Sequence, residues 1–290
     1  MKKKIVTLLY VAIVSLSLFS CKKETIEPER EAGESPGTIL TPPSTKPDLD
    51  VSETLPPVQV AITSNITSNC NGYYVALPAR YDSTTKKYPV IIFLHGQSAL
   101  GNGSADNLKK ISGGPYSLIK NKKFPASFTV GEKSFSFIVI SPQFKTWPSG
   151  DDVDAVVNYF TSKLRIDPTR IYITGLSMGG GAAWDYAGKY ASKIAAIAPV
   201  CGASSTTEAK AKIIANNKLP VWAFHNDGDD RVSVNHTLGY INMLNNMNMT
   251  PKAKMTIYAA AGHDAWSKAY SLTYKENDMN VYEWMLQYHR

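Results

Sequence analysis

From Val58 to the end of the chain, short runs rich in β-branched and aromatic residues alternate with longer segments of helical period. This alternation constrains the fold most strongly, because it is typical of βαβ units and a largely parallel sheet. Two runs, Val90–Leu94 and Ile194–Ala198, are apolar throughout, as central strands are when helices cover both faces of a sheet. We predict strands at Val58–Thr63, Gly72–Leu77, Val90–Leu94, Phe135–Ile140, Ile171–Thr174, Ile194–Ala198, Val221–Phe224 and Met255–Tyr258.

The helical segments complete an α/β domain over residues 58–290, with an eight-stranded, mostly parallel sheet and helices on both faces. We predict helices near Asp151–Leu164, Met178–Tyr190, Thr207–Asn216, Val234–Asn248 and Asn277–Tyr288. Only about twenty residues separate the strands ending near Ala198 and beginning at Val221, so a helical lid domain has no room there. In sheets of this kind ligands bind beyond the carboxyl ends of the strands, and functional residues are expected there.

Composition excludes several other classes of protein. The 290 residues are 43% hydrophobic and 19% charged, which excludes wholesale disorder, a coiled coil and a collagen-like fibre. The net charge is +7, but three of these charges belong to Lys2, Lys3 and Lys4, and the other basic residues form no stripe, so no nucleic-acid partner is predicted. Three cysteines are too few for a disulfide-built scaffold or a Cys-rich zinc module.

The N-terminal segment has the pattern of an export signal. Lys2 to Lys4 precede an apolar run, Ile5–Phe19, that is too short to span a bilayer comfortably. The string ending in Cys21 resembles the lipobox of bacterial lipoproteins, which implies a signal peptide over 1–20, acylation of Cys21 and an outer-membrane lipoprotein facing the periplasm or the cell surface. The alternative is an ordinary secretory signal with an incidental cysteine. Residues 21–57 are rich in Pro, Glu, Ser and Thr, and we predict a flexible tether.

A G-x-S-x-G motif, Gly175 to Gly179, lies between a predicted strand and a predicted helix. That context is typical of a nucleophile elbow, in which a tight turn presents the central residue, here Ser177, to the substrate. The alternative is a Gly-rich turn with a passenger serine. Because a serine hydroxyl is a poor nucleophile at neutral pH, the chemistry also requires a histidine base and a carboxylate that orients it.

His263 follows the last predicted strand and is the candidate base. Among the other histidines, His95 and His225 are interpreted as structural, and His236 and His289 lie on predicted helices with no partner in sight. Three carboxylates, Asp227, Asp229 and Asp230, follow the strand Val221–Phe224. The chain order Ser, Asp, His is the one expected of this kind of fold. The spacing alone leaves the three carboxylates open, and a solvated acidic turn is the alternative interpretation of the cluster.

These motifs resemble those of the α/β-hydrolase superfamily. There the acid commonly lies four residues beyond a histidine in a His-Gly-x-x-Asp pattern, which implies Asp229, with Asp230 in reserve and Asp227 capping the turn. This chain has Asn226 in place of the glycine. The resemblance also implies an oxyanion hole formed by the backbone N–H groups of Gln97, after His95-Gly96, and of Met178.

Within the superfamily the chain resembles secreted feruloyl and acetylxylan esterases, polyhydroxybutyrate-depolymerase-like proteins and predicted peptidases. The strings that carry the resemblance are Leu94-His95-Gly96, Ile140-Ser141-Pro142-Gln143, Asp167-Pro168-Thr169-Arg170, Gly175-Leu176-Ser177-Met178-Gly179 and Gly262-His263-Asp264-Ala265-Trp266. It implies a serine esterase that removes acetyl or feruloyl groups from polysaccharide without a cofactor. A peptidase or a polyester depolymerase on the same triad, and a non-enzymatic glycan-binding lipoprotein, are the alternatives.

Some further residues carry predictions. Trp147 and Trp266 follow strand ends and are candidates to line a substrate site, and the alternative is that they pack at its rim or in the core. Trp184, Trp222 and Trp284 are predicted core residues. Cys70 and Cys201 form a disulfide or remain free thiols. No metal-binding pattern is present in the sequence, and no metal site is predicted. The oligomeric state is left open.

Overall fold

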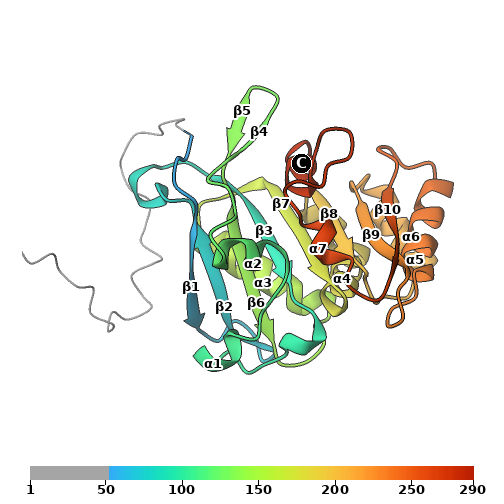
Figure 1. Cartoon of the computed structure of the whole chain (residues 1–290), viewed down its shortest axis with the longest axis horizontal. Coiled ribbons are helices and arrows are strands. Elements are labelled where there is room, and N and C mark those ends of the chain that lie inside the picture. Colours follow the sequence, from blue (N-terminus) through green and yellow to red (C-terminus); the bar gives the residue numbers. More distant parts are fainter. Residues whose placement is uncertain (1–51) are drawn as a thin grey trace, which may run out of the picture. The chain divides into compact units, whose positions relative to one another are not determined.

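The computed structural model describes residues 52–290 (Figure 1). The predicted signal peptide, Cys21 and most of the predicted tether lie outside the described residues. Among the residues described, no helix combines the length and apolar character needed to cross a membrane.

Eight strands form one sheet in the order β1-β2-β6-β3-β7-β8-β9-β10, which runs across Figure 1. The first three strands in this order pair antiparallel, and the other five pairings are parallel. The predicted eight-stranded, mostly parallel sheet is therefore confirmed. The strands are β1 (Val58–Thr63), β2 (Cys70–Leu77), β3 (Tyr88–Leu94), β6 (Ile138–Phe144), β7 (Ile166–Leu176), β8 (Ala196–Val200), β9 (Trp222–Gly228) and β10 (Lys254–Ala261).

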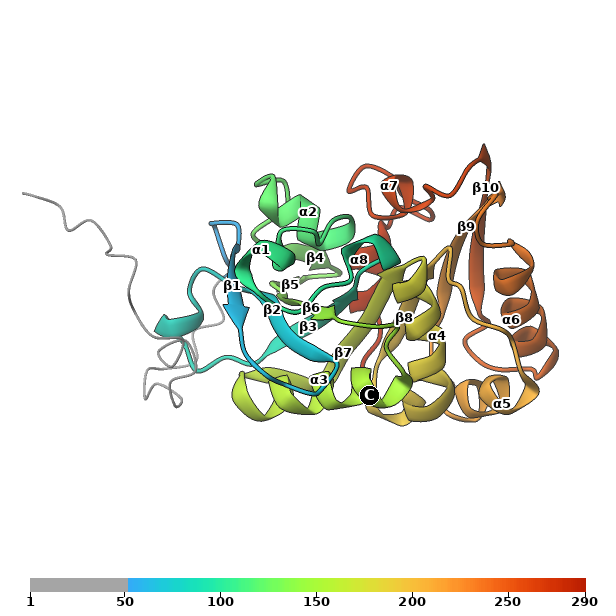
Figure 2. The same cartoon turned by 90° about the horizontal axis from the view of Figure 1, so that it is seen from below.

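Helices cover both faces of the sheet, as predicted (Figure 2). Successive residues of β3 alternate between two cores, because apolar side chains on both faces of the strand are buried. Val90, Ile92 and Leu94 face one core, and Ile91 and Phe93 face the other. One core contains residues of α3 (Gly150–Lys163), α4 (Met178–Tyr190), α5 (Glu208–Asn216) and α6 (Asn235–Asn246). The other contains residues of α1 (Ala105–Leu108), α2 (Gly114–Lys120), α7 (Trp266–Ala269) and α8 (Val281–Leu286).

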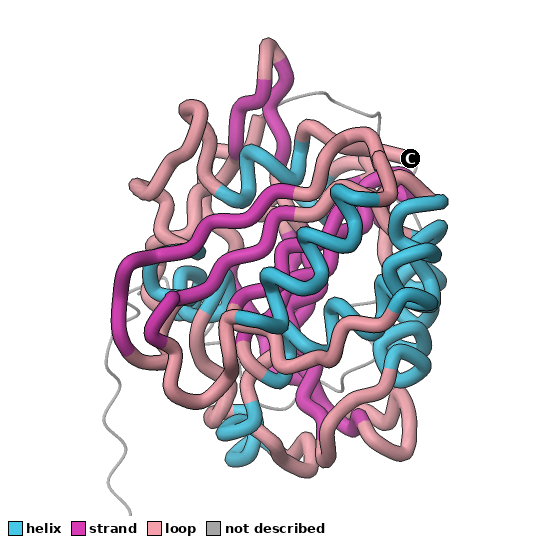
Figure 3. Tube along the Cα trace, turned by 90° about the vertical axis from the view of Figure 1, so that its right-hand side faces the viewer, coloured by secondary structure: helices cyan, strands magenta, loops and turns pink. Residues whose placement is uncertain are grey.

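A short hairpin of β4 (Phe128–Val130) and β5 (Lys133–Phe135) was not expected from the sequence. The predicted strand Phe135–Ile140 divides, because Phe135 ends the hairpin and β6 begins only at Ile138. Between them the Ser136 hydroxyl donates to the carbonyl of Ala126 at 2.7 Å. The hairpin projects beyond the rest of the sheet in both Figure 1 and Figure 3.

Several other predicted boundaries moved; for example, β7 begins at Ile166 rather than at Ile171. The sequence suggested a helix over Asn277–Tyr288, but α8 begins only at Val281, because the Asn280 side chain accepts from the N–H groups of Tyr282 and Glu283 and caps the helix. Strand β8 begins two residues later than predicted, at Ala196.

The sheet has two edge strands, β1 and β10, and β10 leads into the loop that carries His263. Strand β10 pairs only with β9, and most of its residues are half-buried or exposed. Between β8 and β9 the chain forms only α5 and its loops, so the predicted absence of a helical lid at this position is confirmed.

Candidate active site

Ser177 occupies a sharp turn between β7 and α4, with φ 55° and ψ −117°. A non-glycine residue rarely adopts this conformation, so neighbouring contacts must hold it. The Ser177 N–H donates to the carbonyl of Val200 at 2.9 Å, and the Ser177 carbonyl accepts from the N–H of Gly181 at 2.9 Å. The turn is thus fixed by backbone hydrogen bonds to β8 and to the first turn of α4.

The motif glycines allow this turn to pack closely. A Cβ atom at Gly179 would lie 2.0 Å from the carbonyl oxygen of Leu94, the last residue of β3. A Cβ atom at Gly175 would lie 2.5 Å from the Gly179 carbonyl carbon. Glycine is required at both positions because another backbone occupies the space that a side chain would need.

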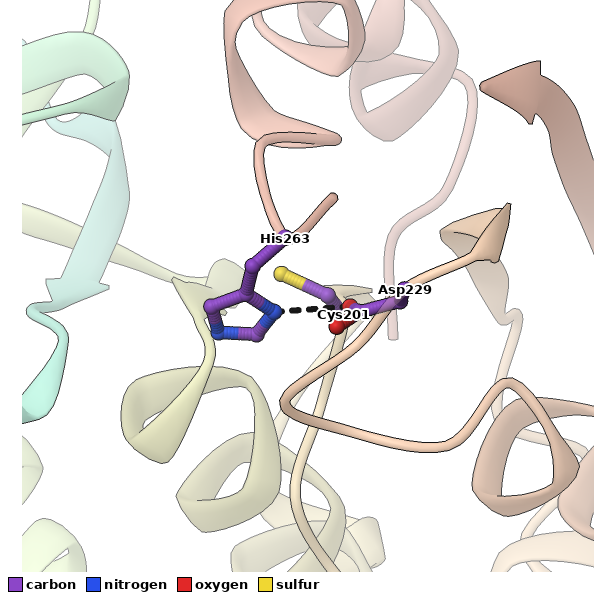
Figure 4. A group of neighbouring side chains, drawn as sticks. All are labelled: Cys201, Asp229 and His263. Carbon is purple, nitrogen blue, oxygen red and sulfur yellow. Dashed lines mark hydrogen bonds and ion pairs between the residues drawn. The ribbon is translucent and has the colours of Figure 1, made fainter. Parts of the chain in front are cut away.

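The three residues predicted as a triad lie in contact. The Ser177 hydroxyl lies 2.8 Å from His263 Nε2, and His263 Nδ1 lies 2.7 Å from a carboxylate oxygen of Asp229. Asp229 directly follows β9, and His263 lies two residues beyond β10. Figure 4 shows the second of these contacts, with the Cys201 side chain beside it. All three groups therefore come from the carboxyl ends of parallel strands.

Asp229, rather than its neighbours in the acidic cluster, contacts the histidine. Its side chain is fully buried and also accepts from the N–H groups of Arg231 and Val232, at 2.9 Å each. Burial alone would raise its pKa, but hydrogen bonds from Val232, His263 and Arg231 together lower it, so the carboxylate is ionised at neutral pH. Asp230 is exposed, and Asp227 accepts from the Ala260 N–H at 3.0 Å.

His225 supports this loop in a way that the sequence did not reveal. It is completely buried, and its Nε2 lies 2.8 Å from the Val232 carbonyl and 3.2 Å from the Asp229 carboxylate. Its Nδ1 lies 2.8 Å from the Thr237 hydroxyl. Burial lowers its pKa, so the ring is neutral, and Nε2 must carry the proton because a carbonyl only accepts. The i, i+4 spacing of His225 and Asp229 was the available signal.

Both predicted oxyanion donors begin a helix. Met178 is the first residue of α4, and Gln97 is the first residue of the 3₁₀ turn Gln97–Ala99. Backbone N–H groups at this position have no acceptor within their own helix and are free for another partner. The two residues follow neighbouring strands, β7 and β3, which brings their loops to the same edge of the sheet.

The loop that carries Gln97 is held by two buried side chains. Gln143, on β6, donates to the carbonyls of Ala99 and Asn107 and accepts from the Gly103 N–H. His95 accepts a hydrogen bond from the Phe144 N–H through Nε2 at 3.0 Å, and burial lowers its pKa to about 4. His95 therefore has the packing position expected for it, whereas the role of Gln143 in holding the loop was not predicted.

A cavity of about 830 Å³ opens onto Ser177 and His263. Both predicted tryptophans line it: Trp147 is 45% exposed, and Trp266 packs edge-on against the His263 ring at 5.3 Å between ring centres. Trp184, Trp222 and Trp284 are buried, as predicted. The cavity therefore has a solvent-exposed indole on its wall next to the serine and the histidine.

The cysteines do not pair. Cys70 and Cys201 are both buried free thiols, which decides between the two alternatives that the sequence left open. The Cys201 sulfur and ligand atoms of Asp229 and His263 lie within 4.8 Å of one another. However, Asp229 and His263 already share a hydrogen bond of 2.7 Å, so a cation between them would require that bond to break. Spacing along the chain could not reveal this cluster, because its members follow three different strands.

Residues 143–288, half of the chain, match the model of the dienelactone hydrolase family, and this range includes all three contacting residues. The chain is 26% identical over 117 residues to the bifunctional acetylxylan esterase/xylanase XynS20E of Neocallimastix patriciarum, a match that covers 37% of this chain and 17% of that protein. The chain thus spans less than a fifth of the length of this curated relative.

Two solved structures share the fold. A thermostable esterase matches with a TM-score of 0.56 and 21% identity, covering 81% of this chain and 63% of the other. A ferulic acid esterase matches with a TM-score of 0.53 and 18% identity, covering 76% of this chain and 95% of the other. The predicted α/β-hydrolase fold is confirmed.

Proposed function

Because the chain belongs to the dienelactone hydrolase family, we propose that it is a serine carboxylic-ester hydrolase in which Ser177, His263 and Asp229 form the catalytic triad. One observation carries the proposal. An unbroken series of hydrogen bonds runs from the Ser177 hydroxyl through His263 to a buried, ionised carboxylate, and it begins at a serine held at positive φ. A binding protein has no use for this arrangement, which argues against the glycan-binding alternative.

The proposed reaction begins when the Ser177 oxygen attacks the ester carbonyl and His263 Nε2 accepts the hydroxyl proton. The Nδ1–H of His263 donates a hydrogen bond to Asp229, which keeps the proton on Nδ1 and leaves the lone pair of Nε2 directed toward Ser177. The N–H groups of Met178 and Gln97 donate to the oxyanion of the tetrahedral intermediate. The intermediate collapses when His263 returns the proton to the leaving alcohol, and water then releases the acid by the same steps.

The substrates that we propose are acetyl or feruloyl esters of polysaccharides. Three features support a bulky substrate: the volume of the cavity, the short connection between β8 and β9, and the exposed face of Trp147. Indole faces stack on sugars and aromatic acids. Two similar proteins are named as an acetylxylan esterase and a ferulic acid esterase, which describes the cleavage of these esters by those proteins. A peptidase or polyester depolymerase would use the same triad and differ only in the substrate cleaved.

A substrate panel tests the proposal. It consists of 4-nitrophenyl acetate, methyl ferulate, acetylated xylan and a peptide anilide, each offered to the protein and to Ser177→Ala. We expect turnover of the esters that depends on Ser177 and little turnover of the anilide. Equal rates for the protein and the variant would refute the triad, and preference for the anilide would establish the peptidase alternative.

We also propose that Cys21 carries the lipid of an exported, outer-membrane lipoprotein, on the sequence pattern described above. Replacing Cys21 with Ser should move the protein from the membrane fraction to the soluble fraction of its host. If the variant stays with the membranes, the anchoring proposal is wrong.

A further inference from the structure

The cavity beside Ser177 contains one permanently charged side chain. Among the described residues that line it, Arg231 is the only Lys or Arg, and no Asp or Glu contributes to the wall. The remaining polar lining consists of Gln97, three serines and His263. The buried carboxylate of Asp229 lies behind this wall, where two N–H groups and His263 already satisfy it. An anionic group at the wall would therefore meet a cation and no carboxylate.

The Arg231 guanidinium is also free to bind. No described residue forms a hydrogen bond, an ion pair or a ring contact with it. By contrast, the Arg165 guanidinium stacks on Tyr81, and that of Arg170 pairs with Asp167 and donates to a carbonyl. The Arg231 main chain, in contrast, is fixed, because its N–H donates to Asp229 at 2.9 Å. A free cation thus extends from a point held rigidly against the proposed triad.

The order of the strands indicates which part of an ester would meet this cation. Gln97 follows β3, on one side of β7 and Ser177, whereas Arg231 follows β9 and His263 follows β10, on the other side. The leaving alcohol must reach His263 Nε2 to receive its proton. Arg231 therefore lies on the same side of the serine as the leaving alcohol.

We propose that Arg231 is a specificity residue that binds a carboxylate on the alcohol portion of the substrate. The substrate class is then an acyl ester on an acidic polysaccharide, in which uronic acids carry the charge. A guanidinium suits this role, since it binds a carboxylate through two parallel hydrogen bonds. The inference rests on the proposed ester hydrolysis and specifies which esters the site prefers.

A pair of small esters with the same acyl group tests this specificity: 4-acetoxybenzoate, which is anionic, and its neutral methyl ester. The quantity to measure is the ratio of their kcat/KM values in the protein, Arg231→Gln and Arg231→Lys. Comparing ratios removes the difference in intrinsic reactivity between the two esters. We expect Arg231→Gln to lower the ratio about fivefold, the upper end of the range for an exposed ion pair, and Arg231→Lys to retain part of the preference.

Lys268→Gln is the matched control. Lys268 is an exposed cation on α7, two residues beyond Trp266, and it does not line the cavity. It contacts the rings of Tyr258 and Tyr274. This variant loses the same charge and should leave the ratio unchanged. An Arg231→Gln ratio equal to that of the protein, or an equal fall in Lys268→Gln, would overturn the inference.

A binding measurement separates failure of this inference from failure of the proposed function. Tryptophan fluorescence can follow 4-hydroxybenzoate and its methyl ester as they bind to Ser177→Ala, because Trp147 and Trp266 line the same cavity. We expect the anion to bind more tightly and to lose that advantage in Ser177→Ala/Arg231→Gln. Absence of ester turnover with this preference intact would refute the hydrolase alone, whereas equal binding of the two compounds would refute the role of Arg231.

Discussion

The two sides of the site are held in different ways. On the side of β3 and β7, the elbow is shaped by main-chain contacts, with Gly179 packed against Leu94 and the Ser177 N–H bound to Val200. On the side of β9 and β10, side chains do this work, since Asp229 is held between His263 and two N–H groups and His225 braces the loop. The first arrangement leaves a contiguous motif in the sequence, whereas the second leaves separated polar residues, of which His225 and Asp229 follow a looser family pattern.

The sharpest way to break the side-chain arrangement is Asp229→Asn. An amide would not hold the His263 tautomer, and we expect kcat/KM on 4-nitrophenyl acetate to fall about a thousandfold or more. Asp230→Asn, at an exposed neighbour of the same charge, should stay within about twofold of the protein. If the second substitution abolishes activity and the first does not, the assignment of the acid is wrong.

Gly179→Ala tests the main-chain contacts that hold the turn at Ser177. Helix propensity alone would favour alanine by about 1 kcal/mol. The added methyl group would lie 2.0 Å from the Leu94 carbonyl oxygen, and we expect the clash to win and lower the free energy of unfolding by about 3 kcal/mol. Denaturant unfolding measures this loss.

The matched control for that substitution is Gly131→Ala in the β4–β5 hairpin. Gly131 has φ +60°, but a Cβ atom there would meet nothing within 4 Å. It should therefore cost only the backbone strain, about 1 kcal/mol. Equal losses in the two variants would show that close packing does not hold the elbow.

Lowering the pH should reduce the stability of the folded protein through His95, which holds the loop that carries Gln97. Its folded pKa of about 4 lies below the ordinary value of 6.5, so between these pH values the unfolded chain gains a proton that the folded protein does not. The free energy of unfolding should therefore fall by about 2 to 3 kcal/mol as the pH drops from 6.5 to 4. In His95→Gln this part of the pH dependence should disappear, and an unchanged slope would exclude His95 as its source.

The smallest expected effect concerns the cavity wall. Trp147→Ala removes an exposed indole without touching the three contacting residues, and we expect kcat/KM on methyl ferulate to fall about fivefold through KM. The rate on 4-nitrophenyl acetate, which has a small acyl group, should change by less than about twofold. A uniform loss on both esters would instead indicate a structural role for Trp147.

Much of this architecture could be predicted from the sequence, because the signals are contiguous in the chain. The apolar run of β3 and the Gly175–Gly179 motif can each be recognised within one short stretch, although the packing that requires them involves neighbouring strands and helices. The hairpin β4–β5 escaped prediction because its strands have three residues each, too few for a period to emerge. The bracing by His225 and by Gln143 escaped because each joins a side chain to a loop whose course only the folded chain defines.

The choice of Asp229 over Asp230 shows where spacing alone stops. Both carboxylates follow the same strand, and adjacent residues differ only in the direction of the side chain. The resemblance to a family motif indicated Asp229, and in the structure the Arg231 and Val232 N–H groups point to that carboxylate alone.

The edge position of β10 bears on how the protein should respond to heat. This strand delivers His263, yet it is bonded to the sheet along one side only, whereas β7, which delivers Ser177, is flanked by two strands. Strands at an edge open at a lower free energy than the centre of a sheet. Thermal inactivation should therefore begin at temperatures where circular dichroism still reports a folded domain, with Ser177 in place and His263 detached from it.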